Sequence, residues 1–279
     1  MGIIKPKLVP FVKWAGGKRE VINKYLHKYF PQSFNNYIEP FAGAASVFLY
    51  LQPNQAIIND VNSELITTFK VIKQDVTSLV IELDKYHKRH SKEFFYQIRK
   101  RKLPQNADLK IAARFIYLNK TCFNGLYRVN KDNQFNVPFG NKSKENLSLY
   151  NADNLNQLAL YLNTHQISFY NQDFETILEM AQPDDFVFCD PPYDFETKPP
   201  SFNAYNPTGF AQAEQKRLAT ALKRLDQKGV KWMHTNHETN LIKTLYKDFT
   251  IIPMRTNRNI NANGSKRKNT GNEVVIMNY

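Results

Sequence analysis

The sequence predicts an α/β fold, in which helices cover an open sheet and a helical module is inserted into it. Strand-like and helical segments alternate before residue 60 and again after residue 165, whereas the stretch between them is long, helical and basic. Helices between strands imply parallel crossovers, and ligands in such sheets bind beyond the carboxyl ends of the strands. A chain of 279 residues is long enough for one such core with an insertion.

The first part of the chain alternates between the two hydrophobic periods. Apolar residues at helical spacing are separated by short apolar runs, and a Gly-containing turn follows the first of these runs. The pattern predicts helices over 21–30 and 44–51, and strands over 37–39 and 56–58, the second of which ends at Asn59 and Asp60.

The middle of the chain reads as helical and then as an ordered loop or hairpin. Asn62 is a suitable N-cap with Glu64 behind it, so helical spacing begins there and continues, with breaks, to about residue 101. It returns over 109–121. The segment 123–140 is rich in Asn, Gly, aromatic residues and Pro, which is typical of an ordered loop or hairpin.

The second half returns to alternation. A helix is expected over 212–225, and strands are expected over 167–170, 186–189, 230–233 and 273–278. We therefore expect a first part of the core over 1–65, an insertion over 66–148 and a second part of the core over 149–279.

Charge points to a polyanionic partner. The chain has 38 Lys and Arg against 25 Asp and Glu, a formal net charge of +13. The excess is clustered over 85–89, 99–102 and 255–268, and such clusters can neutralise phosphates and give salt-dependent affinity. The alternative is that these runs are only solvated faces, which is the common case for a single run.

Neither a membrane nor an oxidising compartment is expected. No apolar stretch approaches the roughly 20 residues that span a bilayer, and the first ten residues mix Lys, Pro and aliphatic side chains. The chain has two cysteines, Cys122 and Cys189, far apart in sequence, which fits a reducing cytoplasm better than a disulfide scaffold. A cytoplasmic protein without a membrane partner is the expectation.

Three carboxylates, Asp60, Asp173 and Asp190, stand at or just after expected strand ends. Asp60 follows the turn around Gly43 at a distance comparable to the roughly 20 residues over which a second-strand acid meets a ribose in nucleotide-binding sheets. The alternative is a carboxylate that caps the following helix. The turn itself is a weak signal, because Ala45 stands where a second glycine is expected.

The string Asp190-Pro191-Pro192-Tyr193 is the most specific in the chain. Two prolines fix the backbone and remove two amide donors, so carbonyl oxygens project as acceptors without competing hydrogens. A carboxylate and a carbonyl held in this way can accept both hydrogens of a planar amino group, while Tyr193 stacks on the ring that bears it. These hydrogen bonds favour the positive charge that develops on nitrogen when it attacks a methyl sulfonium. The alternative is an ordinary Pro-rich turn.

Together these motifs resemble the Dam-type DNA adenine-N6 methyltransferases, the D12 class in the alpha group of amino-methyltransferases. The resemblance covers nearly the whole chain and implies a Rossmann-like sheet that uses S-adenosylmethionine. The segments that carry it, in order, are 13–18, 39–43, Asn59-Asp60, 123–128, 135–140, 172–174 and 190–193.

The resemblance also implies roles for single residues. Asp190, Pro191 and Tyr193 match the catalytic motif. The residues that match cofactor-binding positions are Trp14, Lys18, Phe41, Gly43, Asp60, Asp173, Phe174 and Asp190. Ala45 departs from the pattern, and its methyl group is expected to crowd the cofactor.

Double-stranded DNA is the implied partner, with adenine in GATC as the target. An adenine amino group inside a duplex cannot reach an active site, so the base must be flipped out of the stack. Lys13 and Arg128 resemble residues that touch bases, and Phe123 stands where the family places an inserted aromatic ring. The remaining hairpin positions expected at DNA are Asn124, Leu126 and Pro138.

Other functions stay open or are disfavoured. A methyltransferase acting on RNA or on a protein glutamine needs the same hydrogen-bond acceptors for a planar amino group, but it needs no hairpin that reads a duplex. A DNA-binding protein that has lost catalysis is suggested only by Ala45. A phosphate-binding ATPase lacks the rest of its loop around Gly16-Gly17-Lys18. No metal is expected, because His234 and His237 lie at a strand end without a nearby cysteine.

The biological setting also stays open. The sequence fits an enzyme of a restriction system, a solitary enzyme or a phage enzyme. In a restriction system the partner would be a restriction endonuclease acting on the same site. A monomer is expected in solution.

Overall fold

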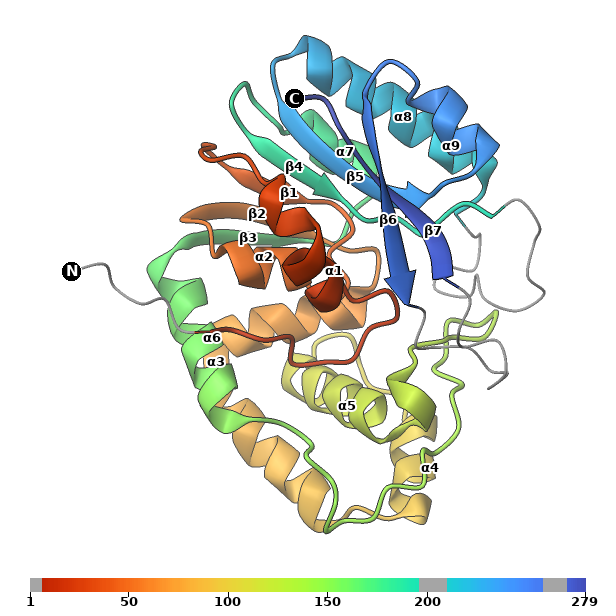
Figure 1. Cartoon of the computed structure of the whole chain (residues 1–279). Helices are drawn as coiled ribbons and strands as arrows, with labels where there is room; N and C mark the ends of the chain where they lie inside the picture. The colour runs from red at the N-terminus through yellow and green to blue at the C-terminus, as the bar shows by residue number, and fades with distance from the viewer. Residues whose placement is uncertain (1–6, 196–209, 258–269) are drawn as a thin grey trace.

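The computed structural model describes residues 7–195, 210–257 and 270–279, which form a seven-stranded sheet with helices on both faces (Figure 1). The expected α/β fold is confirmed. The strand order is β3-β2-β1-β4-β5-β7-β6. The strands are β1 Tyr37–Glu39, β2 Gln55–Asn59, β3 Gln166–Tyr170, β4 Phe186–Cys189, β5 Lys231–His237, β6 Thr250–Asn257 and β7 Thr270–Met277.

The sheet is parallel from β3 to β5, but β7 runs antiparallel between β5 and β6. The sequence pattern did not predict β6, and alternation with helices suggested parallel crossovers throughout. Pro253 weakens the strand signal, but β6 is the last strand in the sheet order, where a residue without an N–H is tolerated. Antiparallel pairing also needs no crossover helix.

Side chains of alternate residues build the cores on the two faces. In β4, Phe186 and Phe188 pack into one cluster, whereas Val187 and Cys189 pack into the other. Figure 1 shows α7, α8 and α9 behind the second half of the sheet and α1 and α2 on the other side. These helices are α1 Arg19–Lys24, α2 Ser46–Leu51, α7 Phe174–Glu179, α8 Gln212–Gln227 and α9 Asn240–Leu245, and a further helix, α6 Ala152–Thr164, precedes β3.

The helix expected over 21–30 is shorter than predicted. It is replaced by α1 and a 3₁₀ turn at Leu26–Lys28, with Tyr25 in a non-helical conformation between them. The Tyr25 hydroxyl donates to the Arg255 carbonyl of β6 at 2.8 Å. The helix therefore breaks at Tyr25, where the side chain contacts a residue 230 positions away in the sequence. Local spacing of apolar residues cannot reveal such a break.

The inserted segment is a helical module at the lower edge of the sheet in Figure 1. Its helices are α3 Ser63–Lys88, α4 Lys92–Lys100 and α5 Asp108–Thr121. Asn62 caps α3 as expected, because its side chain accepts from the Leu65 amide at 3.0 Å. The module lies between β2 and β3, as the expected insertion over 66–148 requires, although its independence as a domain stays a prediction.

A hairpin follows α5 and packs back against its end. Cys122 pairs with Phe139 and Val129 pairs with Phe135, both in antiparallel bridges. A Cβ atom on Gly140 would lie 2.4 Å from the Cys122 carbonyl oxygen, so only glycine allows this approach. No helix in the described parts of the chain is long and apolar enough to cross a membrane.

Arg114 joins the three helices of the module. Its Nη1 pairs with Glu64 Oε1 of α3 at 2.7 Å. The same guanidinium donates to the Ile98 and Arg99 carbonyls at the end of α4, at 3.2 and 3.3 Å. Because Arg114 is buried, its removal leaves several polar groups unpaired.

We predict that Arg114→Ala lowers the free energy of unfolding by about 3 kcal/mol, because it breaks a buried ion pair and frees two carbonyls. Lys110→Ala, an exposed change on the same helix, should stay within about 0.5 kcal/mol of the wild type. Urea unfolding measures both. Equal stabilities of the two variants would refute the structural role of Arg114.

Candidate active site

A cavity of about 670 Å³ opens at the carboxyl ends of β1, β2 and β4. It lies at the point where the strand order reverses between β1 and β4, which is where parallel sheets bind ligands. Segments from distant parts of the sequence meet in its wall. They include Trp14, Lys18, Glu39, Phe41, Gly43, Asp60, Asp190, Pro191, Pro192, Tyr193 and Arg255.

The turn after β1 needs its glycine. Gly43 has φ +48°, and a Cβ atom there would lie 2.8 Å from the Trp14 indole. Ala45 also has a positive φ of 52°. Its methyl group is fully buried and does not line the cavity, so the structure gives no sign of the expected crowding.

Asp60 is fixed at the end of β2 by two backbone donors. The Gly43 and Asn62 amides donate to its Oδ2 and Oδ1, each at 2.8 Å. Burial raises its pKa, although both hydrogen bonds favour the carboxylate. The turn after β1 and the carboxylate after β2 are therefore held as one unit.

Glu39 is a site residue that sequence reasoning did not single out. It ends β1, is buried, lines the cavity and accepts from the Phe48 amide of α2 at 3.2 Å. Burial raises its pKa well above the usual value. An acidic residue in a short buried strand was the available signal, because such a group is rarely buried without a purpose.

Asp190 has both carboxylate oxygens engaged. Lys18 Nζ lies 2.7 Å from Oδ2, and the Thr235 hydroxyl donates to Oδ1 at 2.7 Å. Lys18 also donates to the Gly16 carbonyl at 2.8 Å and lies 5.1 Å from the centre of the Tyr193 ring. Burial raises the pKa of Tyr193, and the negative charge of Asp190 adds to the shift.

The two prolines of this loop differ in their surroundings. The Pro192 carbonyl accepts from Gln215 Nε2 at 2.9 Å. The Pro191 carbonyl accepts no hydrogen bond from residues 7–195, 210–257 or 270–279. Pro191 is thus the carbonyl left to receive a hydrogen from a ligand, beside the Asp190 carboxylate.

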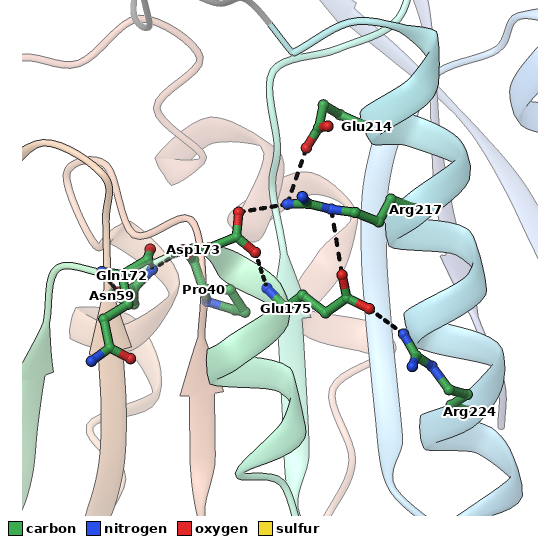
Figure 2. A network of polar contacts seen from close by, with 8 residues as sticks. All are labelled: Pro40, Asn59, Gln172, Asp173, Glu175, Glu214, Arg217 and Arg224. Carbon is green, nitrogen blue, oxygen red and sulfur yellow. Dashed lines mark hydrogen bonds and ion pairs between the residues drawn. The ribbon is translucent and has the colours of Figure 1, made fainter.

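Asp173 and Phe174 do not line the cavity. Asp173 caps α7 by accepting from the Glu175 amide at 2.9 Å, and its other oxygen pairs with Arg217 of α8 (Figure 2). The Phe174 ring packs on Phe41 with centroids 5.3 Å apart. Phe174 therefore supports the wall to which Phe41 belongs.

Asn59 ties three strand ends together in the same region (Figure 2). This fully buried side chain donates to the Pro40 and Gln172 carbonyls at 2.9 and 3.1 Å and accepts from the Gln172 amide at 2.9 Å. Sequence reasoning placed Asn59 in a motif but gave it no role. Its contacts fix the spacing between the loops after β1 and β3.

The N-terminal segment connects the cavity to the hairpin. The Lys13 amide donates to Asn119 Oδ1, and Asn119 Nδ2 donates back to the Lys13 carbonyl, both at 2.8 Å. Asn119 also donates to the Gly125 carbonyl at 3.2 Å. The Trp14 indole stacks on Tyr127 of the hairpin with centroids 5.6 Å apart.

The residues expected at DNA lie mostly at the surface of this hairpin. Phe123 is 52% exposed, and Leu126 is half-buried. Arg128 donates through Nε to Asn136 Oδ1 at 2.7 Å, which orients its guanidinium. The exposed members of the set are Lys13, Phe123, Asn124, Arg128 and Pro138.

Three lysines gather near the base of the hairpin. Burial lowers the pKa of Lys120 to about 8, and the charges of Lys13 and Lys142 add to the shift. Burial and the Lys13 charge also lower the pKa of Lys142. Like charges held this closely favour an anionic ligand.

The other basic runs have mixed roles. Arg99 donates to the Val137 carbonyl of the hairpin at 3.1 Å, so this member of the run 99–102 has a structural contact. Arg255 lines the cavity. Arg258 and Lys266, which belong to the expected DNA-binding run 255–268, lie outside the described residues.

The thiols offer no nucleophile. Cys122 and Cys189 are free and buried, and burial raises the pKa of Cys122 to about 12 and that of Cys189 further. A thiolate, the reactive form, is therefore disfavoured at both positions. The site can orient an acceptor amino group, but it cannot supply sulfur for covalent catalysis.

Comparison with known proteins assigns the family. A model of the D12 class N6 adenine-specific DNA methyltransferases matches residues 14–260. The chain is 36% identical to the type II methyltransferase M1.LlaDCHI of Lactococcus lactis, over 99% of this chain and 97% of that protein. It is 36% identical to the type II methyltransferase M.MjaIII of Methanocaldococcus jannaschii, over 97% and 99% of the two chains.

A third relative is named a DNA adenine methylase. The chain is 30% identical to the DNA adenine methylase of Escherichia coli, over 92% of this chain and 91% of that protein. The family match spans the turn after β1, the Asp60 carboxylate and the Asp190 loop, whose geometry suits an amino group as acceptor. The chain belongs to the D12 class N6 adenine-specific DNA methyltransferases, which are S-adenosylmethionine-dependent enzymes.

Proposed function

We propose that this protein transfers the methyl group of S-adenosylmethionine to the N6 atom of an adenine flipped out of double-stranded DNA, within the sequence GATC. The geometry of the loop after β4 is the observation that supports the proposed methyl transfer. The loop places the Asp190 carboxylate and the Pro191 carbonyl, which accepts no hydrogen bond within the described parts of the chain, in the wall of the cavity that Asp60 also lines. The target sequence rests on the resemblance of the hairpin to the Dam-type family.

The residues of the cavity fit the cofactor. Asp60 is held by backbone donors at the end of β2, with lone pairs left over for ribose hydroxyls. Trp14, Phe41 and Gly43 supply an aromatic and open wall beside it. Held there, S-adenosylmethionine would supply a methyl group activated by its positive sulfur, with the neutral thioether as leaving group and the amino proton released to solvent.

The chain's own residues orient the amino group for this step. The Asp190 carboxylate and the Pro191 carbonyl accept its two hydrogens, which turns the nitrogen lone pair towards the methyl group. Tyr193 offers a ring on which the adenine stacks. Lys18 holds Asp190 at 2.7 Å, so the arriving amino group competes with this ion pair for Oδ2.

Access to the amino group requires that the base leaves the duplex. Unstacking costs a few kcal/mol, which stacking on Tyr193 and an inserted aromatic ring offset. Phe123 is suited to the latter role, because a phenyl ring that is 52% exposed at a hairpin edge gains from insertion between bases. The other residues that we propose contact DNA lie in the hairpin or in the N-terminal segment beside it. They are Lys13, Asn124, Leu126 and Pro138.

Arg128 is our proposed specificity residue. Asn136 holds its Nε, which leaves the two terminal amino groups as a two-pronged donor suited to the major-groove edge of guanine. Two relatives are named type II methyltransferases, which favours a restriction endonuclease acting on the same site as a partner. We further propose that the enzyme acts as a monomer in the cytoplasm.

We expect Asp190→Ala to lower the rate of methyl transfer by roughly 10²–10³, because it removes an acceptor aimed at the reacting nitrogen. DNA affinity should largely persist, since phosphate contacts lie elsewhere. Radiolabelled methyl incorporation and DNA binding measure the two effects, with the exposed Asp153→Ala as control. A rate within about tenfold of the wild type would overturn the role of Asp190.

Arg128→Ala is expected to relax guanine preference at one position of GATC, by about 1–3 kcal/mol, and to leave cofactor affinity unchanged. Methylation kinetics on duplexes with single substitutions in GATC give the result. Lys131→Ala at the exposed tip of the same hairpin is the matched control. Equal losses on every duplex would show that Arg128 pairs with a phosphate instead.

DNA affinity should fall as pH rises through about 8, because the pKa of Lys120 is lowered to about 8 and its ammonium loses the charge that binds phosphate. The loss between pH 7 and 9 should be roughly tenfold, the value of one charged hydrogen bond. Binding at constant ionic strength tests this. Lys120→Arg should flatten the pH dependence, whereas exposed Lys131→Arg should not. A flat wild-type curve would contradict the prediction.

A further inference from the structure

A buried network of polar side chains lies directly beneath the loop that carries Asp190. Its members come from β5 and α8, and each is fully buried. The network ends on the backbone of the loop at three places, the carbonyls of Cys189 and Pro192 and the amide of Asp194. The side chains that make these contacts are His234, Asn236 and Gln215.

The first contact fixes the state of His234. Its Nδ1 lies 3.3 Å from the Cys189 carbonyl, which can only accept, so Nδ1 carries the hydrogen. Burial lowers the pKa of His234 to about 3, which keeps the ring neutral. Its Nε2 is then an acceptor, and it lies 3.3 Å from Asn236 Nδ2.

Asn236 uses both ends of its amide. Nδ2 directs one hydrogen to His234 Nε2 and the other to Gln215 Oε1 at 3.1 Å. Oδ1 accepts from the amides of Asp194 at 2.9 Å and His237 at 2.8 Å. Asn236 therefore has a single orientation that satisfies every donor and acceptor.

Gln215 completes the network from α8. Its Oε1 accepts from Asn236, so its Nε2 points the other way and donates to the Pro192 carbonyl at 2.9 Å. No rotation of this amide preserves both contacts, because the flipped group would set oxygen against oxygen. The direction of every hydrogen bond in the network follows from the two carbonyls at its ends.

The loop needs such support because it cannot hold itself. Pairing between β4 and β5 ends at Cys189 and His234, and the two residues after Asp190 are prolines, which have no N–H to donate. Side chains from the neighbouring strand and helix thus replace the missing backbone ladder. A fully satisfied buried network of this kind fixes a single geometry.

We propose that Gln215, Asn236 and His234 are positioning residues that set the orientation of the Asp190 carboxylate and the Pro191 carbonyl towards the target amino group. The proposal rests on the proposed function, since it assigns these residues to the same reaction. None of the three side chains lines the cavity itself, so their loss acts on the rate of the chemical step and not on binding. The kcat should respond, while the KM for the cofactor and the affinity for DNA should not.

Gln215→Met keeps the size of the side chain but removes the donor to Pro192. We expect kcat to fall roughly 10- to 100-fold, because small displacements of reacting groups have effects of this order. The KM for S-adenosylmethionine and the Kd for DNA should stay within about twofold of the wild type. Gln227→Met, at an exposed position of the same helix, is the matched control and should leave all three values unchanged.

Gln215→Glu adds a pH profile that a merely structural role would not produce. A protonated glutamic acid can donate to the Pro192 carbonyl, whereas the carboxylate cannot. The kcat of Gln215→Glu relative to the wild type should therefore rise as pH falls from 8.5 to 6.5, while the ratio for Gln215→Met stays flat. Equal pH dependence of both ratios, or a KM that rises with the loss of kcat, would overturn the proposal.

Hydrogen exchange separates this proposal from the proposed function. Asn236→Ala removes the acceptor of the Asp194 amide, so exchange of that amide should accelerate at least tenfold while the amides of α8 keep their protection. This readout needs no activity. Unchanged exchange at Asp194 would refute the support of the loop by Asn236. A wild-type enzyme that transfers no methyl group would refute the proposed function, and the exchange result would then still show whether the network supports the loop.

Discussion

The ion pair between Lys18 and Asp190 is the interaction on which the arrangement of the site depends. Its atoms lie 2.7 Å apart, and the two side chains are only 6% and 20% exposed. A carboxylate at this depth is costly without a cation, and a lysine is equally costly without an anion. The pair therefore holds the N-terminal segment against the end of β4. Removal of either partner leaves an uncompensated charge beside the cavity.

This constraint extends to the hairpin over 123–140. The same N-terminal segment carries Trp14, which stacks on Tyr127, and Lys13, whose backbone is bonded to Asn119 of α5. The hairpin that we propose to read DNA and the loop that we propose to orient the amino group thus share one short connecting segment. We infer that the recognition surface and the chemical site keep a fixed distance, which suits an enzyme that must choose a base and then modify it.

Much of the fold and the site follows from local sequence. Six of the seven strands, the helical module, the hairpin over 123–140 and the meeting of Asp60 with the Asp190 loop follow from periodicity, turn residues and strand ends. What local pattern could not supply are contacts over long separations. The break at Tyr25, the antiparallel β6 with Pro253, and the pairing of Asp173 with Arg217 each depend on a partner that only the folded chain brings near. The support of the Asp190 loop by Gln215 and Asn236 belongs to the same class, because these residues give no signal of their own in the sequence.

The central claim is that the chain methylates adenine at N6, and one measurement tests it directly. Plasmid DNA free of adenine methylation is incubated with the purified protein and S-adenosylmethionine, then digested to nucleosides and analysed by mass spectrometry. The geometry of the Asp190 loop predicts N6-methyladenine as the modified nucleoside. Unmodified DNA, or a methyl group found on cytosine instead, would contradict the account.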